Sequence, residues 1–104
     1  LGWVIENLVK NSADAMKGSG EITIRLTESA TEAYVDVEDT GKGIPRKDFK
    51  TIFKPGYTTR ERGWGLGLSL SKRIVEEYHK GKIFVLRSEP GHGSCMRIIL
   101  KKGR

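Results

Sequence analysis

The chain has 104 residues and a mass of 11.6 kDa, which allows one small domain or a part of a larger one. With 37% apolar and 31% charged residues it is too apolar to be disordered, and no apolar run approaches the roughly 18 residues of a membrane span. The single cysteine, Cys95, excludes an internal disulfide and a zinc site built on paired cysteines, so we expect a reducing, cytoplasmic setting.

The net charge of +6 is unevenly distributed. Residues 1–52 carry 7 Lys and Arg against 9 Asp and Glu, whereas residues 53–104 carry 12 against 4. A basic half suits an anionic partner, such as nucleic acid, a lipid surface or a phosphorylated small molecule, and it is equally typical of a solvated surface. Because the basic residues form no helical stripe interleaved with aromatics, we expect neither nucleic-acid binding nor direct membrane contact.

The first half of the chain predicts a helix followed by a β-hairpin. Apolar residues recur at helical spacing over residues 1–16, and a glycine-rich segment ends that pattern. Residues 21–26 and 33–39 then alternate between apolar and polar, as half-buried strands do. The apolar faces of the two strands are formed by Ile22, Ile24 and Leu26, and by Val35 and Val37.

The second half predicts loops, a helix and a second strand pair. A loop at residues 39–45 precedes a short helix at 46–53, and residues 54–67 show no clear period. Residues 68–79 predict a helix, and residues 82–87 and 94–101 predict two strands. The apolar side of this helix is predicted to contain Leu70, Ile74, Val75 and Tyr78.

This order of elements predicts an α+β fold in a single domain over residues 1–104. Strands joined by short links pair antiparallel, and two helices can cover only one face of such a sheet, which gives a two-layer α/β sandwich. Because the chain begins inside a helical pattern with no capping residue ahead of it, we expect N-terminal elements of the fold to be missing.

Two groups of polar residues lie where apolar ones are expected. Asp39 is in phase with Val35 and Val37, so its carboxylate points inward and needs hydrogen-bond donors. It either caps a turn ahead of Gly41 or accepts a hydrogen bond from a ligand's amino group. Asn7 and Asn11, four residues apart, share one helix face beside the apolar stripe; their amides could bond to nearby backbone, or their oxygens could bind Mg²⁺ that carries phosphate.

A third feature is the run of glycines at positions 63, 65 and 67, which leads directly into the predicted helix. Backbone N–H groups at a helix N-terminus, reached over glycines, can bind phosphate. The spacing matches neither the dinucleotide fingerprint nor a P-loop, and alone it is a weak signal.

Taken in order, ENLVKNSADAM, DTGKGI, IFKPGYTT and GWGLGLSL resemble the N box, first glycine box, F box and second glycine box of sensor histidine kinases. That family belongs to a superfamily that also contains DNA gyrase, the mismatch-repair ATPases and a heat-shock chaperone. Its members share the Bergerat-type ATP-binding fold. The closing GKIFVLRSEPGHGSCMRIIL is similar to the family's final hairpin, so the resemblance covers essentially the whole chain.

The resemblance implies a role for each matching position. Asp39 would bind the adenine amino group, Gly41 and Gly43 would shape the adenine pocket, and Ile44 would line it. Asn11 would bind Mg²⁺, and Asn7 would lie beside the phosphates. Residues from about 53 to 67 would form the ATP lid. The remaining positions implied to contact nucleotide are Arg60, Arg62, Gly63, Gly65, Gly67, Leu68 and Ser94.

Asn7 bears on the type of reaction. In the ATPase branch of the superfamily, the residue one turn before the magnesium asparagine is a glutamate that activates water. An amide at this position, together with a lid of about a dozen residues, favours a kinase over a hydrolase.

Three positions depart from the family pattern, and one segment is absent. Asp14 stands where many members carry Lys or Arg, and Gly56 replaces a common aromatic of the F box. Ser94 stands where a threonine often sits near the adenine, and its hydroxyl can make the same contact. No helix carries a phosphoacceptor histidine followed by an acidic residue and a proline, and His79 and His92 are expected to be structural or at the surface. The phosphoacceptor histidine and its base therefore come from elsewhere in the full protein.

The resemblance implies the ATP-binding catalytic domain of a protein-histidine kinase with MgATP as cofactor. Its partners would be the dimerisation and histidine phosphotransfer domain of the same protein and a downstream response regulator. The domain would be cytoplasmic, with the parent protein free or membrane-anchored, and could not autophosphorylate alone. The alternatives are an ATPase or an anti-sigma-type serine kinase of the same superfamily, and a degenerate nucleotide-binding interaction domain.

Overall fold

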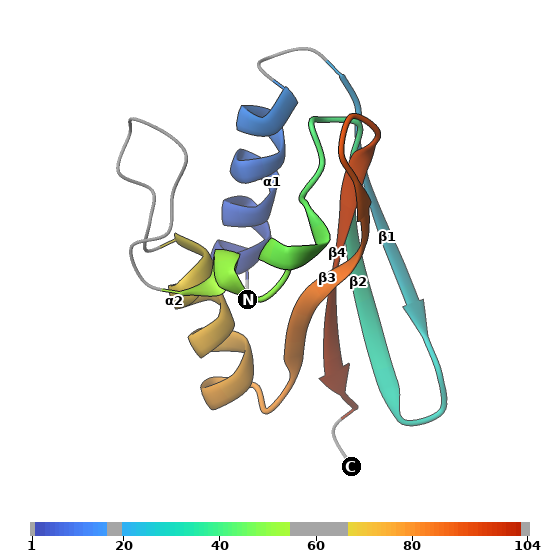
Figure 1. The fold of residues 1–104 in the computed structure, drawn as a ribbon. Helices are drawn as coiled ribbons and strands as arrows, with labels where there is room; N and C mark the ends of the chain where they lie inside the picture. Colours follow the sequence, from blue (N-terminus) through green and yellow to red (C-terminus); the bar gives the residue numbers. More distant parts are fainter. Residues whose placement is uncertain (1, 17–19, 55–66, 103–104) are drawn as a thin grey trace.

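The computed structural model describes residues 2–16, 20–54 and 67–102, and its element order is the one that the sequence predicts (Figure 1). No helix in these ranges is long and apolar enough to cross a membrane. The elements are α1 (Gly2–Met16), β1 (Ile22–Glu28), β2 (Glu32–Asp39), the 3₁₀ turns η1 (Arg46–Asp48) and η2 (Thr51–Phe53), α2 (Gly67–Arg73), the π-helical segment η4 (Ile74–Tyr78), β3 (Lys82–Glu89) and β4 (Gly93–Lys101).

The strands form one antiparallel sheet in the order β1-β2-β4-β3. The two hairpins, β1–β2 and β3–β4, join through pairing of β2 with β4 at the centre of the sheet. This pairing sets Asp39, the last residue of β2, directly opposite Ser94 near the start of β4. Residues distant in sequence are thereby brought together at one end of the sheet.

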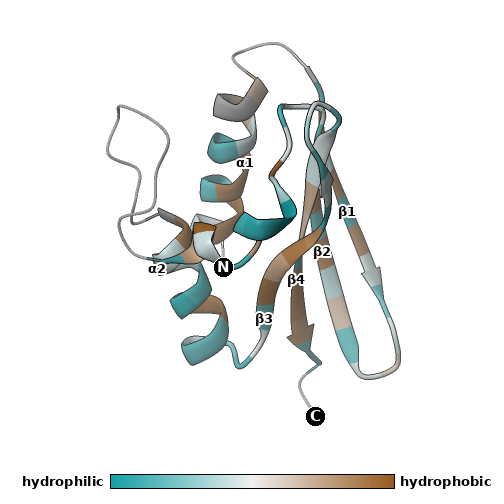
Figure 2. Cartoon of the chain, in the orientation of Figure 1, coloured by the Kyte–Doolittle hydropathy of each residue, from teal (hydrophilic) through white to brown (hydrophobic). Residues whose placement is uncertain are grey.

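The helices pack on one face of this sheet, which confirms the α+β, two-layer architecture (Figure 1). Apolar residues follow β3 and β4 in Figure 2, and they meet the apolar stripes of the helices. Burial of each such side chain favours folding by roughly 1.5–3 kcal/mol. The buried core residues come from α1, β2, η2, η4, β3 and β4. They are Val4, Leu8, Val35, Val37, Ile52, Phe53, Val75, Ile83, Val85, Met96 and Ile98.

The predicted burial of β1 is wrong for two of its three apolar residues. Ile22 is partly buried against the core, but the exposed fractions of Ile24 and Leu26 are 46% and 73%. The cause is the strand order, because β1 lies at the edge of the sheet away from β3, and the helices of the described chain pack mainly over β2, β4 and β3 (Figure 1).

The predicted apolar side of the last helix is also partly wrong. Val75 is fully buried and Ile74 packs against the core, whereas Leu70 is 41% and Tyr78 74% exposed. The buried position next to Leu70 is Ser71, and adjacent residues of an α-helix point about 100° apart. From Ile74 onward the helix is a π-helix, whose wider turn changes the phase of the residues that follow.

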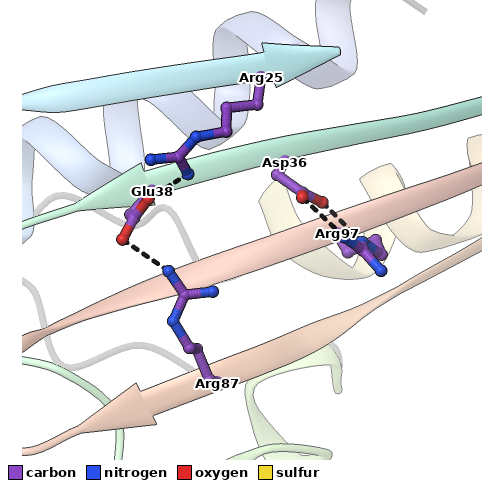
Figure 3. A network of polar contacts seen from close by, with 5 residues as sticks. All are labelled: Arg25, Asp36, Glu38, Arg87 and Arg97. Atoms are coloured by element: carbon purple, nitrogen blue, oxygen red, sulfur yellow. Dashed lines mark hydrogen bonds and ion pairs between the residues drawn. The ribbon is translucent and has the colours of Figure 1, made fainter. Parts of the chain in front are cut away.

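The face of the sheet away from the helices carries a network of charged side chains (Figure 3). Arg97 donates two hydrogen bonds to Asp36, of 2.7 and 2.8 Å, and Glu38 pairs with both Arg25 and Arg87. The hydrogen bonds from Arg97 hold the pKa of Asp36 below its ordinary value. Cys95, opposite Glu38 in the sheet, is buried, and that burial raises the pKa of its thiol.

Candidate functional site

Asp39 is a buried carboxylate held by two donors from different parts of the chain. Its exposed fraction is 6%; Oδ1 accepts a hydrogen bond of 2.8 Å from the Gly41 amide, and Oδ2 accepts one of 3.1 Å from the Ser94 hydroxyl. The turn-capping bond considered from the sequence is therefore present. Since each carboxylate oxygen has two lone pairs, each can accept one further hydrogen bond from a ligand.

The loop after Asp39 is held against the turn between β3 and β4. Gly43 has a φ of +80°, and a Cβ atom there would lie 2.3 Å from the carbonyl oxygen of Glu89, so only glycine fits. The Ile44 amide donates to Ser88 Oγ at 2.6 Å, and the Ile44 side chain packs against the core. Gly41, Gly43 and Ile44 thus lie together with Asp39 in one fixed segment.

Thr40 connects this loop to α1. Its hydroxyl donates to Met16 Sδ at 3.5 Å and accepts from the Glu21 amide at 3.1 Å. Asn11 lies five residues before Met16 on α1, which is about 7.5 Å along a helix axis. The fold therefore brings the helix with the two asparagines to the end of the sheet that carries Asp39.

The two asparagines have different surroundings. Asn7 is 5% exposed, and its Nδ2 donates to the fully buried Ser71 hydroxyl of α2 at 3.1 Å. Asn11 is partly buried one turn later on the same face of α1. Asn7 thus joins the two helices, while Asn11 is the amide closer to Thr40 along α1. Among the described residues, no group of three or more His, Cys, Asp or Glu lies together to hold a metal.

Part of the expected site lies outside the described residues, namely Arg60, Arg62, Gly63, Gly65, Gly56 and the lid from residue 55 to 66. Of the second glycine box, Gly67 is the first residue of α2, and Leu68 packs partly buried against the core. Asp14 lies in α1. Within the described ranges, both histidines, His79 and His92, are exposed.

Sequence reasoning missed two hydroxyls that fix the loop, those of Thr40 and Ser88. Nothing in the local pattern distinguishes them from other polar residues, because their partners are 24 and 44 positions away in the chain. A cavity of about 350 Å³ lies at this end of the sheet. Its lining includes Asp39, Ser88 and Ser94, together with Glu38 and Arg87 of the outer-face charge network and residues of the β3–β4 turn. Asn7 and Asn11 are not among them.

The chain is similar to named sensor kinases along almost its whole length. It is 40% identical to sporulation kinase C of Bacillus subtilis over 96% of this chain and 23% of that protein. It is 39% identical to the signal transduction histidine-protein kinase AtoS of Escherichia coli over 96% of this chain and 16% of that protein. The chain therefore spans less than a quarter of the length of these relatives.

Solved structures agree with the sequence relatives. The catalytic domain of histidine kinase ThkA, in a nucleotide-free form, superposes with a TM-score of 0.83 at 34% identity, over 95% of this chain and 65% of that one. A structure of ThkA in complex with the response regulator protein TrrA matches with a TM-score of 0.80 at 33% identity, over 96% of this chain and 28% of that one. Residues 1–104 match the family described as histidine kinase-, DNA gyrase B- and HSP90-like ATPase, and the chain belongs to that family.

Proposed function

We propose that the chain binds MgATP and presents its γ-phosphate to a histidine on a separate domain of a two-component sensor kinase. The observation that carries the proposal is the buried carboxylate of Asp39, which the Gly41 amide and the Ser94 hydroxyl hold with acceptor positions to spare. A carboxylate so fixed selects a ligand that offers N–H donors, as the amino group of adenine does.

Each part of the nucleotide is assigned to residues of this chain. Asp39 accepts from the adenine amine, Gly41 and Gly43 let the backbone approach the base, and Ile44 and Ser94 complete this end. Asn11 provides an amide oxygen to Mg²⁺, a ligand type suited to this hard cation. Asn7, Gly67 and Leu68 lie on the α1–α2 side toward the phosphates, and Arg60, Arg62, Gly63 and Gly65 belong to the lid.

The proposed chemistry is phosphoryl transfer, in which the protein positions the reactants and neutralises charge. The γ-phosphoryl group leaves ADP and bonds to a ring nitrogen of the acceptor histidine, and an aspartate of a response regulator then takes it. Asn7 favours this reaction over hydrolysis, because an amide that donates to Ser71 has no basic atom with which to activate water. Because ATP is supplied in the cytoplasm, the proposal includes a cytoplasmic location for the domain.

A titration of the folded chain with a non-hydrolysable ATP analogue, followed by calorimetry with and without Mg²⁺, tests the binding step. We expect one-to-one binding that ADP displaces and GTP does not, because guanine has a carbonyl oxygen where adenine has its amino group. A folded chain that binds no nucleotide, or binds GTP equally well, would contradict the proposal. Acid-labile phosphate on a histidine of the parent protein, after incubation with ATP, would establish the transfer step.

A further inference from the structure

We propose that Ser88 is a positioning residue for the adenine end of this site, acting through the loop that carries Gly43 and Ile44. The inference rests on the proposed nucleotide-binding function and adds to it a residue that no sequence motif indicates. Ser88 lies in β3, 44 positions after Ile44. Its side chain is on the same face of the sheet as those of Asp39 and Ser94 because β3 contains a bulge.

A β-bulge gives Ser88 this orientation. Up to the bulge Val85 faces the core opposite Met96, and simple alternation would send Ser88 to the outer face. The irregularity between Val85 and Arg87 inserts one residue, so that Arg87 pairs with Cys95 and Ser88 pairs with Ser94. Since Ser94 is itself opposite Asp39, three polar side chains form a row across β2, β4 and β3.

The Ser88 hydroxyl uses both of its hydrogen-bonding roles to connect two segments. It accepts from the Ile44 amide at 2.6 Å and donates its hydrogen to the Gly93 carbonyl oxygen at 3.0 Å. A hydroxyl has one hydrogen to donate, so these two bonds fix its direction. No apolar side chain of similar size can replace both bonds.

Backbone contacts reinforce the connection on either side of Ser88. The Gly91 amide donates to the Lys42 carbonyl oxygen at 2.7 Å, and the Gly43 Cα packs directly on the Glu89 carbonyl. A Cβ atom at Gly93 would lie 2.2 Å from the Asp39 carbonyl oxygen, so the turn also approaches the end of β2 at backbone distance. The β3–β4 turn is therefore the support on which residues 41–44 rest, and Ser88, near the end of β3, adds a side-chain bond to that loop.

Substitution of Ser88 by alanine removes the acceptor of the Ile44 amide without disturbing Asp39 directly. We expect Ser88→Ala to weaken binding of ADP and of the ATP analogue by the same factor, with or without Mg²⁺, because only the adenine end is affected. The expected factor is about three- to tenfold, the net free energy of one hydrogen bond expressed as a ratio. Ser88→Thr, which keeps the hydroxyl, should restore most of the affinity.

Ser29→Ala is the matched control. The Ser29 hydroxyl also accepts from backbone amides in a turn, those of Thr31 and Glu32, but it lies in the β1–β2 turn at the opposite end of the sheet. We expect it to leave nucleotide affinity unchanged. Exchange of the Ile44 amide hydrogen, followed by NMR in nucleotide-free protein, should accelerate in Ser88→Ala and not in Ser29→Ala.

The outcomes separate this inference from the proposed function. If the wild type binds nucleotide while Ser88→Ala binds equally well, or if Ser29→Ala weakens binding as much, the role of Ser88 is wrong and the proposed function stands. If the folded wild type binds no nucleotide, the proposed function fails, and the role of Ser88 in it fails too. Loss of affinity confined to the Mg²⁺-bound ligand would also overturn the inference, since it would place the effect at the phosphates.

Discussion

Asp39 accepts hydrogen bonds from the Gly41 amide and the Ser94 hydroxyl. These two bonds offset much of the free-energy cost of burying its charge. A buried carboxylate with two intramolecular donors is stable in the free protein and needs no rearrangement before a ligand arrives. That property suits a recognition group, because the geometry that the ligand meets is already set.

Asp39→Asn tests this residue. The amide keeps the size and one oxygen, but it presents an NH₂ group where the carboxylate has its second acceptor. We expect affinity for the ATP analogue to fall by about 10- to 100-fold, the range for a hydrogen bond to a charged group. Calorimetry measures the change, and Asp36→Asn, three residues earlier on the opposite face of β2, is the control that should retain affinity. Equal affinity in Asp39→Asn and the wild type would exclude Asp39 from the site.

Asn11→Ala tests the metal position. If the Asn11 amide oxygen binds Mg²⁺, its loss should weaken binding of the ATP analogue when Mg²⁺ is present and leave binding in EDTA unchanged. Paired titrations in the two buffers give the measurement. A loss of the same size in EDTA would mean that Asn11 supports the fold and does not bind the metal.

At the scale of elements, the central strands are joined on the outer face by the Asp36–Arg97 pair (Figure 3). Both oxygens of Asp36 are bonded, its side chain is 10% exposed, and the Arg97 guanidinium also lies 5.0 Å from the centre of the Tyr34 ring. Because this pair has two parallel hydrogen bonds and little solvent around Asp36, we expect it to stabilise the sheet more than the exposed pairs of Glu38 with Arg25 and Arg87 do.

We expect Asp36→Asn to lower the free energy of unfolding by about 1–3 kcal/mol at neutral pH. The hydrogen bonds from Arg97 hold the pKa of Asp36 below its ordinary value of 3.8 in the folded chain, so this stabilisation is complete above that pH and is lost as the pH falls through the folded pKa. In urea unfolding at several pH values, the difference in free energy of unfolding between wild type and Asp36→Asn should therefore become smaller at acid pH.

Glu28→Gln is the control for that experiment. Glu28 also pairs with a cation, Lys102, but its side chain is 68% exposed, so solvent screens the interaction and the effect should be smaller. If the difference in free energy of unfolding between wild type and Asp36→Asn is constant across the pH range, the variant acts through packing and not through the charge of Asp36.

At the scale of the whole molecule, the candidate site depends on both layers of the fold. Asp39, Thr40 and Ser94 belong to the sheet and its loop, Met16 and Asn11 to α1, and the loop is supported by the β3–β4 turn. Because the site exists only when these elements are assembled, a ligand that binds there stabilises the folded chain as a unit.

We expect the ATP analogue at 100 times its dissociation constant to raise the free energy of unfolding by about 2.7 kcal/mol. Thermal unfolding measures this as a rise in Tm. At the same ligand concentration the stabilisation should fall to about 0.4–1.4 kcal/mol in Asp39→Asn, because its affinity is about 10- to 100-fold lower, and no rise should occur with GTP. Binding seen by calorimetry without any rise in Tm would mean that the nucleotide binds the unfolded chain as well, and would contradict a site built from the assembled layers.

Periodicity predicted every helix and strand of the described chain to within a few residues, including the α1 stripe and both hairpins. Local patterns succeed here because the spacing of apolar residues along an element differs between helices and strands. The failures at Ile24, Leu26, Leu70 and Tyr78 have a common cause, since burial depends on which elements are neighbours. An edge strand and a π-helical turn both depend on tertiary packing, which the spacing of apolar residues does not encode.

The element order and the two-layer class follow from the amino-acid pattern, and four ordered motifs in it indicate the family and the candidate site residues. Asp39 was identifiable because a charge in phase with an apolar face is a local anomaly. The contacts of these residues became visible in the folded chain: Ser94 and Gly41 hold Asp39, Asn7 bonds to Ser71, and Ser88 supports the loop at Ile44. Three of these four contacts join residues 44 to 64 positions apart, and their geometry depends on strand order, register and one bulge, which arise when the sheet assembles.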